Sequence, residues 1–319
     1  MILKKQLIVI IGGPTASGKS KLALDLALSF GGSVINADSM QIYREMKILT
    51  ARPTETEEKR VKHRLYGIIS VKDRCSAGRW CALALSAIAD SQMDNQLPIV
   101  VGGTGLYLKA LIDGLPPIPP ISDEIRDKSV ALYKDYGAEK FYQYLQKRDP
   151  EGMLKLTPSN TQRILRAYQV IESTGRSLSD WQSMQRQSTG FKGEIKTFIL
   201  NPPRDLLYES CNMRAIKIAS NGGIQEAKNL ISLNLDPTLP AMKAIGVPEF
   251  AAYLNGESDS KQATDRLCVA TRRYAKRQIT WFRHQIPKAY RFNSLYKSHN
   301  QNIIFQKIKT FLNQPGATD

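Results

Sequence analysis

The chain has few of the residues from which protein metal sites and cross-links are built. Its only histidines are His63, His284 and His299, which leaves little for a histidine-based metal site. Four cysteines are present, and no pair has the two-residue spacing of a zinc ribbon or knuckle. They are Cys75, Cys81, Cys211 and Cys268. We therefore exclude a zinc ribbon or knuckle.

Long hydrophobic runs are also missing. The first apolar run, Leu7–Ile11, is too short for the core of a signal peptide, and glycines follow it at once. No run approaches the roughly 18–20 apolar residues that span a bilayer. The sequence therefore predicts a protein of the reducing cytoplasm with no membrane partner.

Acidic residues are scarce relative to basic ones. The chain has 45 Lys and Arg against 29 Asp and Glu, a formal net charge of +16. Residues 261–319 alone hold 12 Lys or Arg against two Asp, which gives +10 of that charge. A charge of this size and distribution indicates a polyanionic partner and says nothing about the fold.

Short buried strands alternate with helices in the first hundred residues. A continuous apolar run of this length, bounded by glycine or a polar residue, is typical of a strand covered on both faces. The predicted strands are Leu7–Ile11, Ser33–Ala37 and Leu97–Val101, and the predicted helices are Lys21–Phe30 and Trp80–Met93. This order predicts an α/β fold with a parallel sheet flanked by helices, of the P-loop NTPase-like kind.

The pattern is interrupted at 115–121, where four prolines within six residues form a stiff, extended hinge. Helices alone are predicted after it, at Asp123–Tyr136, Ala138–Lys147 and Thr161–Ser173, before a further strand at Lys196–Leu200. We therefore predict an all-helical insertion domain at 122–187. The catalytic core is then 1–121 with 188–319, helical and basic toward its C-terminus, and 286–319 has no assigned role.

A phosphate-binding motif, G-x4-G-K-S, lies between the first strand and the first helix, which is the context it requires. Its backbone amides point at phosphate oxygens at a helix N-terminus, Lys19 adds a positive charge, and the Ser20 hydroxyl can ligate Mg²⁺. The residues are Gly13, Pro14, Thr15, Ala16, Ser17, Gly18, Lys19 and Ser20. The motif predicts a di- or triphosphate ligand. Neither N-K-x-D nor a clear Walker B strand occurs, so a GTPase is disfavoured.

Two polar residues follow the next two buried strands. Asp38 ends the second strand, and Thr104 follows the third in V-G-G-T-G-L-Y. Ligands of an open parallel sheet bind outside the carboxyl ends of its strands, so both can face the phosphate loop. Asp38 is then either a general base or a residue that closes an Asx turn. Thr104 is either a substrate contact or a turn hydroxyl that caps the next helix.

Taken together, these residues resemble the bacterial tRNA dimethylallyltransferases, also called tRNA isopentenyltransferases. The resemblance covers about 7–285 and rests on six segments: G-P-T-A-S-G-K-S at 13–20, A-D-S-M-Q-I-Y-R at 37–44, A-R-P-T at 51–54, V-G-G-T-G-L-Y at 101–107, N-T-Q-R-I-L-R-A at 160–167 and A-T-R-R-Y-A-K-R-Q-I-T-W at 270–281. One departure is Leu49, which stands where the family usually has glycine.

The resemblance implies an enzyme, a prenyltransferase of tRNA modification. It would move a dimethylallyl group from dimethylallyl diphosphate to N6 of the adenosine 3′ of the anticodon, releasing diphosphate. The phosphate loop would hold the donor with Mg²⁺ as the cofactor. The family's catalytic residues correspond to Asp38 as base, Thr104 near the reacting centre and Arg214 on the diphosphate. An arginine fork suits two phosphate oxygens at once.

The resemblance also implies contacts with the anticodon stem-loop of tRNA. They correspond to Asp38, Ser39, Met40, Gln41, Thr104, Arg126, Gln162, Arg163, Ile164, Leu165, Arg166, Lys243, Gly246, Arg272, Arg273, Lys276 and Arg277. Arg163 and Arg166 are three residues apart and share a helix face, which is either an RNA contact or a solvated surface. We expect the chain to act as a monomer.

Three other functions fit part of this pattern. Prenylation of free AMP would use the same chemistry, but a mononucleotide needs neither the helical insertion nor the basic C-terminal segment. A P-loop small-molecule kinase would use the loop with ATP and Asp38 on a hydroxyl. A noncatalytic RNA-binding module would leave the phosphate loop unexplained. Separate trials with dimethylallyl diphosphate, ATP, AMP and tRNA distinguish these functions.

Overall fold

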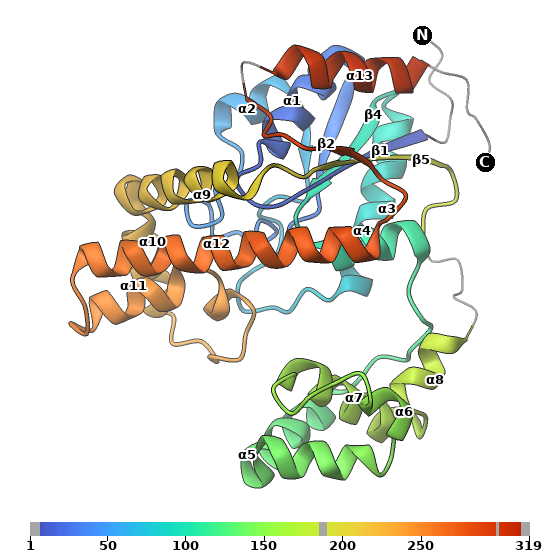
Figure 1. The fold of residues 1–319 in the computed structure, drawn as a ribbon, viewed down its shortest axis with the longest axis vertical. Coiled ribbons are helices and arrows are strands. Elements are labelled where there is room, and N and C mark those ends of the chain that lie inside the picture. The colour runs from blue at the N-terminus through green and yellow to red at the C-terminus, as the bar shows by residue number, and fades with distance from the viewer. Residues whose placement is uncertain (1–6, 185–189, 298–299, 314–319) are drawn as a thin grey trace. The chain divides into compact units, whose positions relative to one another are not determined.

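The computed structural model describes residues 7–184, 190–297 and 300–313. The chain forms two compact units (Figure 1). The first consists of Met1–Ile112 with Gly190–Asp319, and the second of Asp113–Thr189. The predicted insertion at 122–187 lies within the second unit, and its last three residues are outside the described ranges.

A six-stranded parallel sheet forms the centre of the first unit, with the strand order β3-β2-β4-β1-β5-β6. This confirms the predicted fold class. The strands are β1 (Leu7–Gly12), β2 (Gly32–Asn36), β3 (His63–Arg64), β4 (Leu97–Gly102), β5 (Glu194–Leu200) and β6 (Tyr290–Phe292). The β1, β2 and β4 strands are almost wholly buried, as their unbroken apolar runs require.

Helices cover this sheet and extend from it (Figure 1). The N-terminal set is α1 (Lys19–Phe30), α2 (Glu55–Arg60), α3 (Ala77–Met93) and α4 (Gly105–Asp113). The C-terminal set is α9 (Arg204–Ile218), η1 (Ala219–Gly223), α10 (Ile224–Ile231), η2 (Ala241–Lys243), α11 (Val247–Leu254), α12 (Ser260–Gln285) and α13 (Gln301–Asn313). Of all the helices described, none is long and apolar enough to cross a membrane.

The C-terminal tail adds structure that the sequence analysis did not predict. The helical C-terminal part was predicted and is formed by α9 to α13, but β6 was not predicted, and it extends the sheet by pairing with β5. Beyond it, α13 contacts α1, and Phe292, Tyr296 and Ile304 are buried in the same core as β1. Three strand residues are too few to give a clear alternation, so only the pairing with β5 identifies this strand.

In the part of the second unit that the structure describes, every element is a helix. It contains α5 (Asp123–Gln146), α6 (Pro150–Met153), α7 (Thr161–Thr174) and α8 (Leu178–Ser183). Two helices were predicted where α5 lies, and a kink at Gly137, with φ of 73°, divides it at that junction. The core of the unit is made by Phe141, Leu145, Met153, Ile164 and Tyr168.

Candidate functional site

The phosphate loop connects β1 to α1 in a conformation that depends on glycine. Gly18 has φ of 92°, and a Cβ added there would lie 2.4 Å from the carbonyl oxygen of Tyr296. At this helix N-terminus, no side chain of the described residues caps the first turn. The Ser17 hydroxyl is fully buried and has no hydrogen-bond partner within the described structure. Free amides at the positive end of a helix are suited to bind an anion.

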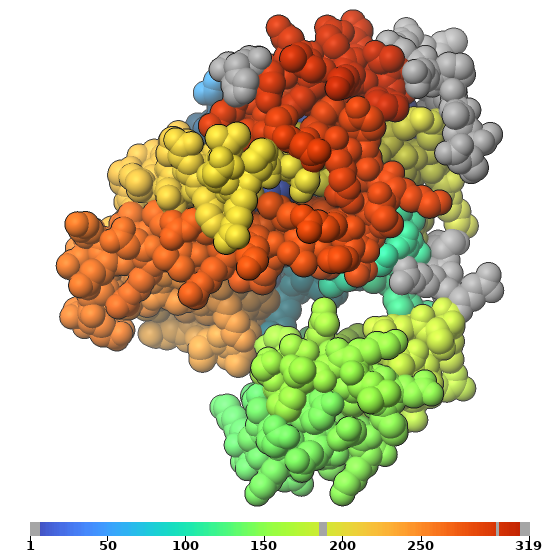
Figure 2. Space-filling model, in the orientation of Figure 1, coloured from blue at the N-terminus to red at the C-terminus, as the bar shows by residue number. Residues whose placement is uncertain are grey.

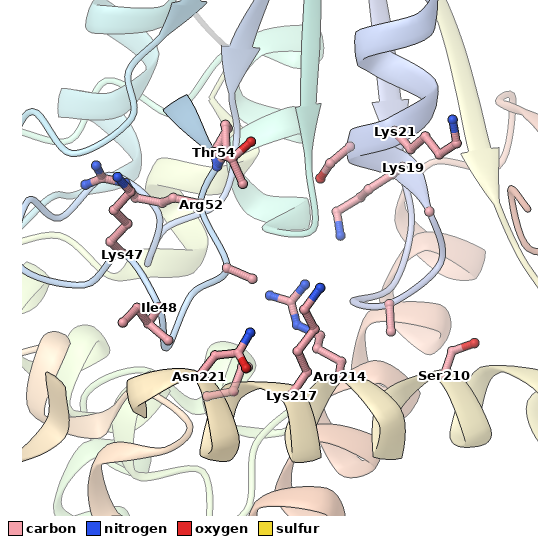
Figure 3. Close-up of a pocket in the computed structure, with 16 residues that line it drawn as sticks. Lys19, Lys21, Lys47, Ile48, Arg52, Thr54, Ser210, Arg214, Lys217 and Asn221 are labelled. Carbon is pink, nitrogen blue, oxygen red and sulfur yellow. The ribbon is translucent and has the colours of Figure 1, made fainter. Parts of the chain in front are cut away.

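A cavity of about 610 Å³ opens beside this loop. Its walls come from the loop, the segment 47–54, α9 and η1, and Figure 3 shows Lys19 and Arg214 extending toward one space. None of the described residues that line it is acidic, whereas six are cationic: Lys19, Lys21, Lys47, Arg52, Arg214 and Lys217. Such a lining selects an anion of several charges, as a diphosphate is.

Two cations of this cavity are affected by burial. Burial lowers the pKa of Lys19 to about 8, Asp38 acts in the opposite direction, and Arg214 lowers it further. Burial likewise lowers the pKa of Arg214, while Asp38 raises it. The Arg214 guanidinium is held by the carbonyl of Thr50, to which its Nη2 donates at 2.8 Å. Two desolvated cations beside one carboxylate are poised to be stabilised by a bound anion.

Asp38 lies just beyond the carboxyl end of β2 and closes the Asx turn that was one of its two interpretations. Its Oδ1 accepts the Met40 amide at 2.9 Å, and its own amide donates to Oδ1 of Asn36 at 2.8 Å. Asn36 is fully buried and also donates to the Asp38 and Leu65 carbonyls. The turn fixes one carboxylate oxygen. It does not exclude a base, because the second oxygen remains to accept a proton.

Thr104 lies beside Asp38, as the topology predicted. Its Oγ1 accepts the Ser39 amide at 2.9 Å and donates to the Ser39 hydroxyl at 3.2 Å. Its amide donates to the Ala37 carbonyl, so the loops after β2 and β4 are joined. The structure therefore brings together Lys19, Arg214, Asp38 and Thr104 at one end of the sheet.

Two residues of this site, both on α12, were not predicted from the sequence. Gln278 is buried; its Oε1 accepts the Thr15 amide at 2.8 Å, and its Nε2 donates to the Gly103 carbonyl at 2.9 Å. Tyr274 is close enough to be affected by Asp38 and Thr104: burial and Asp38 raise its pKa, and a hydrogen bond with Thr104 opposes them. The only signal in the sequence was their place in the basic A-T-R-R-Y-A-K-R-Q segment.

The predicted RNA contacts on α12 divide into two groups. Arg273, Lys276 and Arg277 are exposed and line a shallow hollow with Trp281 and His284. Figure 2 shows that α12 lies open along one face of the first unit. Arg272 differs, since its Nη1 donates to Oδ1 of Asn212 on α9 and holds the two helices together. One nitrogen of its guanidinium is therefore already engaged within the protein.

Two predicted contacts near the loop 46–52 also have structural partners. Gln41 donates to the Thr50 and Ala51 carbonyls at 3.0 and 3.1 Å. Gly246 is buried with φ of 104°, and a Cβ there would lie 2.6 Å from Cδ2 of Leu49. Gly246 therefore packs closely against Leu49.

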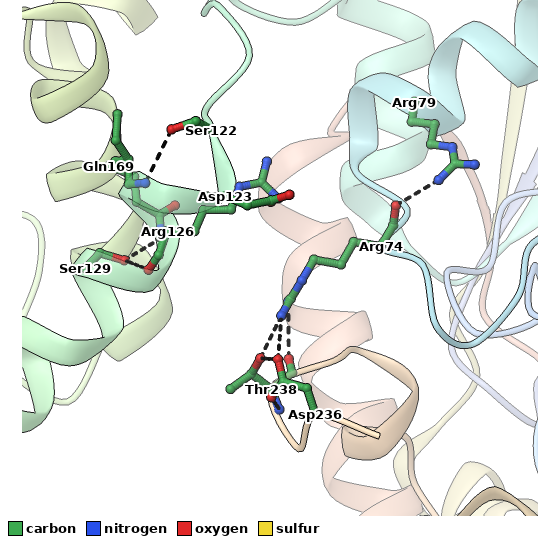
Figure 4. Close-up of polar contacts among 10 residues, drawn as sticks. Arg74, Arg79, Ser122, Asp123, Arg126, Ser129, Gln169, Asp236 and Thr238 are labelled. Carbon is green, nitrogen blue, oxygen red and sulfur yellow. Dashed lines mark hydrogen bonds and ion pairs between the residues drawn. The ribbon is translucent and has the colours of Figure 1, made fainter. Parts of the chain in front are cut away.

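Polar contacts hold the neighbouring segments of this region in place. Ser39 is engaged with Thr104, Met40 is half-buried, and Lys243 is exposed. Arg74 pairs with Asp236 and donates to Thr238, two residues of the segment before η2 (Figure 4). Of these positions, Lys243 is an exposed cation that can meet an RNA phosphate.

The second unit contains the remaining predicted RNA contacts. Gln162 and Arg163 are exposed on α7, and Arg166 is half-buried, its pKa lowered by burial and then by Arg126. Arg126 pairs with Asp123 at 3.7 Å, and Figure 4 shows it beside Ser129, which bonds its carbonyl. The structure places Ile164 and Leu165 in the core, so their side chains cannot contact RNA.

Comparison with known proteins places this geometry in one group. The family model described as IPP transferase matches residues 41–285, and the Isopentenyl transferase model matches residues 6–74. The tRNA dimethylallyltransferase of Rhodospirillum centenum is 48% identical over 90% of this chain and 91% of its own, and that of Nitrobacter hamburgensis is 46% identical over 88% of each.

Solved structures agree with the sequence matches. The crystal structure of a tRNA isopentenylpyrophosphate transferase from Bacillus halodurans has a TM-score of 0.69 and 33% identity, covering 97% of both chains. The shared segments thus extend over nearly the whole chain and include the phosphate loop. The chain belongs to the IPP transferase family.

Proposed function

We propose that the chain transfers a dimethylallyl group from dimethylallyl diphosphate to N6 of the adenosine 3′-adjacent to the anticodon in tRNA, with release of diphosphate. The observation that carries this proposal is the meeting of a phosphate loop and two half-buried, desolvated cations, Lys19 and Arg214, with Asp38 and Thr104 at one sheet end. The relatives named tRNA dimethylallyltransferase support the same reaction.

The donor diphosphate is held by the phosphate loop from Gly13 to Ser20, by Lys19 and by Arg214. Their positive charge stabilises the diphosphate as it leaves, when negative charge develops on the bridging oxygen. Preorganised charge of this kind is usually the largest single contribution to catalysis. The apolar residues of the same cavity, Ile48 and Ile218 among them, provide surface for the hydrocarbon part of a donor.

Mg²⁺ fits this site as an ion carried with the substrate. The lining offers hydroxyls of Ser20, Thr54 and Ser210 but no carboxylate among its described residues, and the described chain holds no cluster of three acidic, His or Cys ligands. Mg²⁺ commonly keeps several waters and binds substrate phosphates with one or two protein oxygens. Ser20 would supply such an oxygen, and the ion would neutralise part of the diphosphate charge.

Asp38 is proposed as the base toward the acceptor. The N6 lone pair forms a bond to C1 of the dimethylallyl group, the C1–O bond breaks, and its electron pair leaves with diphosphate. The N6 proton goes to the Asp38 carboxylate oxygen that the Met40 amide does not engage. Thr104, fixed by Ser39, lies beside this carboxylate and is proposed to position the amine.

The RNA is proposed to bind exposed or half-buried polar residues, most of them cations, on both units. On the first unit these are Arg273, Lys276 and Arg277 of α12, with Lys243 near η2. On the second they are Arg163 and Arg166 of α7, together with Gln162 and with Arg126 of α5. Cations of this type contact phosphates and position the nucleic acid. We further propose that the chain works as a monomer in the cytoplasm.

A single acceptor comparison tests the function. Initial rates are measured with dimethylallyl diphosphate and either AMP or an anticodon stem-loop as acceptor, at two salt concentrations. We expect prenylation of the stem-loop, weakened by salt, and little reaction with AMP. Comparable rates for the two acceptors would refute the tRNA assignment. Turnover of ATP with a small alcohol would favour a kinase, and binding of RNA with no turnover a noncatalytic module.

A further inference from the structure

One wall of the cavity is the loop 46–52, whose backbone is anchored by a carboxylate from another helix. Glu226 of α10 accepts the amides of three successive residues: Lys47 at 2.9 Å, Ile48 at 2.8 Å and Leu49 at 2.8 Å. Consecutive amides that point in one direction form an anion-binding concavity. Here the protein's own carboxylate is the anion, and charge-assisted bonds of this type are about twice as strong as neutral ones.

The side chain of Leu49 anchors the same loop a second time. It is 5% exposed, and its Cδ2 occupies the space that a Cβ on Gly246 would need. Leu49 is the position at which this chain departs from the usual glycine of the family. The leucine therefore has a defined packing site. The loop is held at two places: its backbone amides bond Glu226 of α10, and its Leu49 side chain packs beside the start of α11.

Thr50, the next residue of the loop, contacts one residue on the donor side of the site and one on the acceptor side. The Thr50 carbonyl accepts Nη2 of Arg214 at 2.8 Å and Nε2 of Gln41 at 3.0 Å. Arg214 faces the cavity, whereas Gln41 continues from the turn that contains Asp38. A shift of the loop therefore moves both side chains, because one oxygen orients them.

We propose that Glu226 is a positioning residue for Arg214: by holding the amides of residues 47–49, it sets the Thr50 carbonyl that aims the guanidinium at the diphosphate. Glu226 is not among the residues that line the cavity, so it acts through the loop. The identification of the bound anion as a diphosphate rests on the proposed function, whereas the link from Glu226 to Arg214 does not.

The test compares Glu226→Gln and Glu226→Ala with a matched control, Glu209→Gln, an exposed carboxylate on the helix that carries Arg214. Hydrogen exchange is measured at the amides of residues 47–49, and equilibrium binding with inorganic diphosphate as the probe. Kinetic constants are then measured with dimethylallyl diphosphate and an anticodon stem-loop. The thermal midpoint of each variant shows whether it is folded.

We expect faster exchange at these amides and weaker diphosphate binding, by about ten-fold for Glu226→Gln and more for Glu226→Ala, because small misplacements of a binding group are costly. KM for the donor should rise by a similar factor, while stem-loop affinity stays within about two-fold of wild type, because Gln41 is only one of many expected RNA contacts. Glu209→Gln should behave as wild type.

Three outcomes would overturn the proposal. They are unchanged diphosphate affinity in folded Glu226 variants, an equal loss of diphosphate and stem-loop affinity, and an effect of Glu209→Gln as large as that of Glu226→Gln. Failure of the proposed function would look different. Wild-type protein would then turn over no stem-loop, while exchange and diphosphate binding would still report on Glu226.

Discussion

Raising the pH from 7 to 9 should weaken binding of dimethylallyl diphosphate by about ten-fold, because Lys19 loses its proton over this range. Its pKa is lowered to about 8 in the free protein, with burial as the main cause. The protonated fraction of such a group falls from about 0.9 at pH 7 to about 0.1 at pH 9. A bound diphosphate favours the charged form and raises the pKa of Lys19.

The sign of the effect follows from these two states. Below pH 8 the free site already carries the proton, so affinity is nearly constant. Above pH 8 binding must take up a proton, and affinity falls by about ten-fold for each further pH unit. The donor contributes no such change, because the second ionisation of a phosphate is near pH 6 and is complete in this range.

The assay is equilibrium binding of dimethylallyl diphosphate without an acceptor, at constant ionic strength, between pH 7 and 9. Two variants assign the midpoint to Lys19, because Asp38 raises the pKa of Lys19 and Arg214 lowers it. Asp38→Asn should therefore move the midpoint below 8, and Arg214→Gln should move it above 8. A flat wild-type profile would refute the reasoning, as would midpoints that move in the same direction in both variants.

Two further predictions concern the acceptor. Asp38→Asn should lower turnover by about 10²–10⁴, the range for loss of a general base, with stem-loop binding within a few-fold of wild type; normal turnover would remove Asp38 from the mechanism. Replacing Arg163 and Arg166 by Ala should weaken stem-loop binding and flatten its salt slope by roughly 0.7–0.9 for each phosphate that the variant no longer neutralises. Filter binding at several salt concentrations measures this, with Lys134→Ala and Lys140→Ala as a charge-matched control pair; equal effects of the two pairs would leave α7 without a special role.

Features that depend on neighbouring residues could be predicted from the sequence. A buried strand, a glycine-rich turn and the beginning of a helix all lie within 20 residues. The phosphate loop and the parallel sheet could therefore be predicted from local pattern. The place of Asp38 and Thr104 at one sheet end followed from the rule for strand ends in open parallel sheets. Their mutual link through Ser39 is consistent with that expectation.

Other features depend on contacts between distant segments, and no local pattern encodes them. Gln278 lies 263 residues from Thr15, yet its side-chain amide bonds the Thr15 amide of the phosphate loop and the Gly103 carbonyl. Ile164 and Leu165 lie in a stretch that was expected to contact RNA. Both are buried, because α7 packs against another helix, and no local pattern encodes that packing.

The sequence by itself therefore determined the fold class, the anion-binding loop and the excess of positive charge, because these arise from short-range periodicity, glycine conformation and composition. The tertiary structure alone decided which polar groups face each other. It paired Glu226 with the amides of residues 47–49, and β6 with β5. Buried polar groups must find partners, and which partner each one finds is fixed only when distant elements pack together.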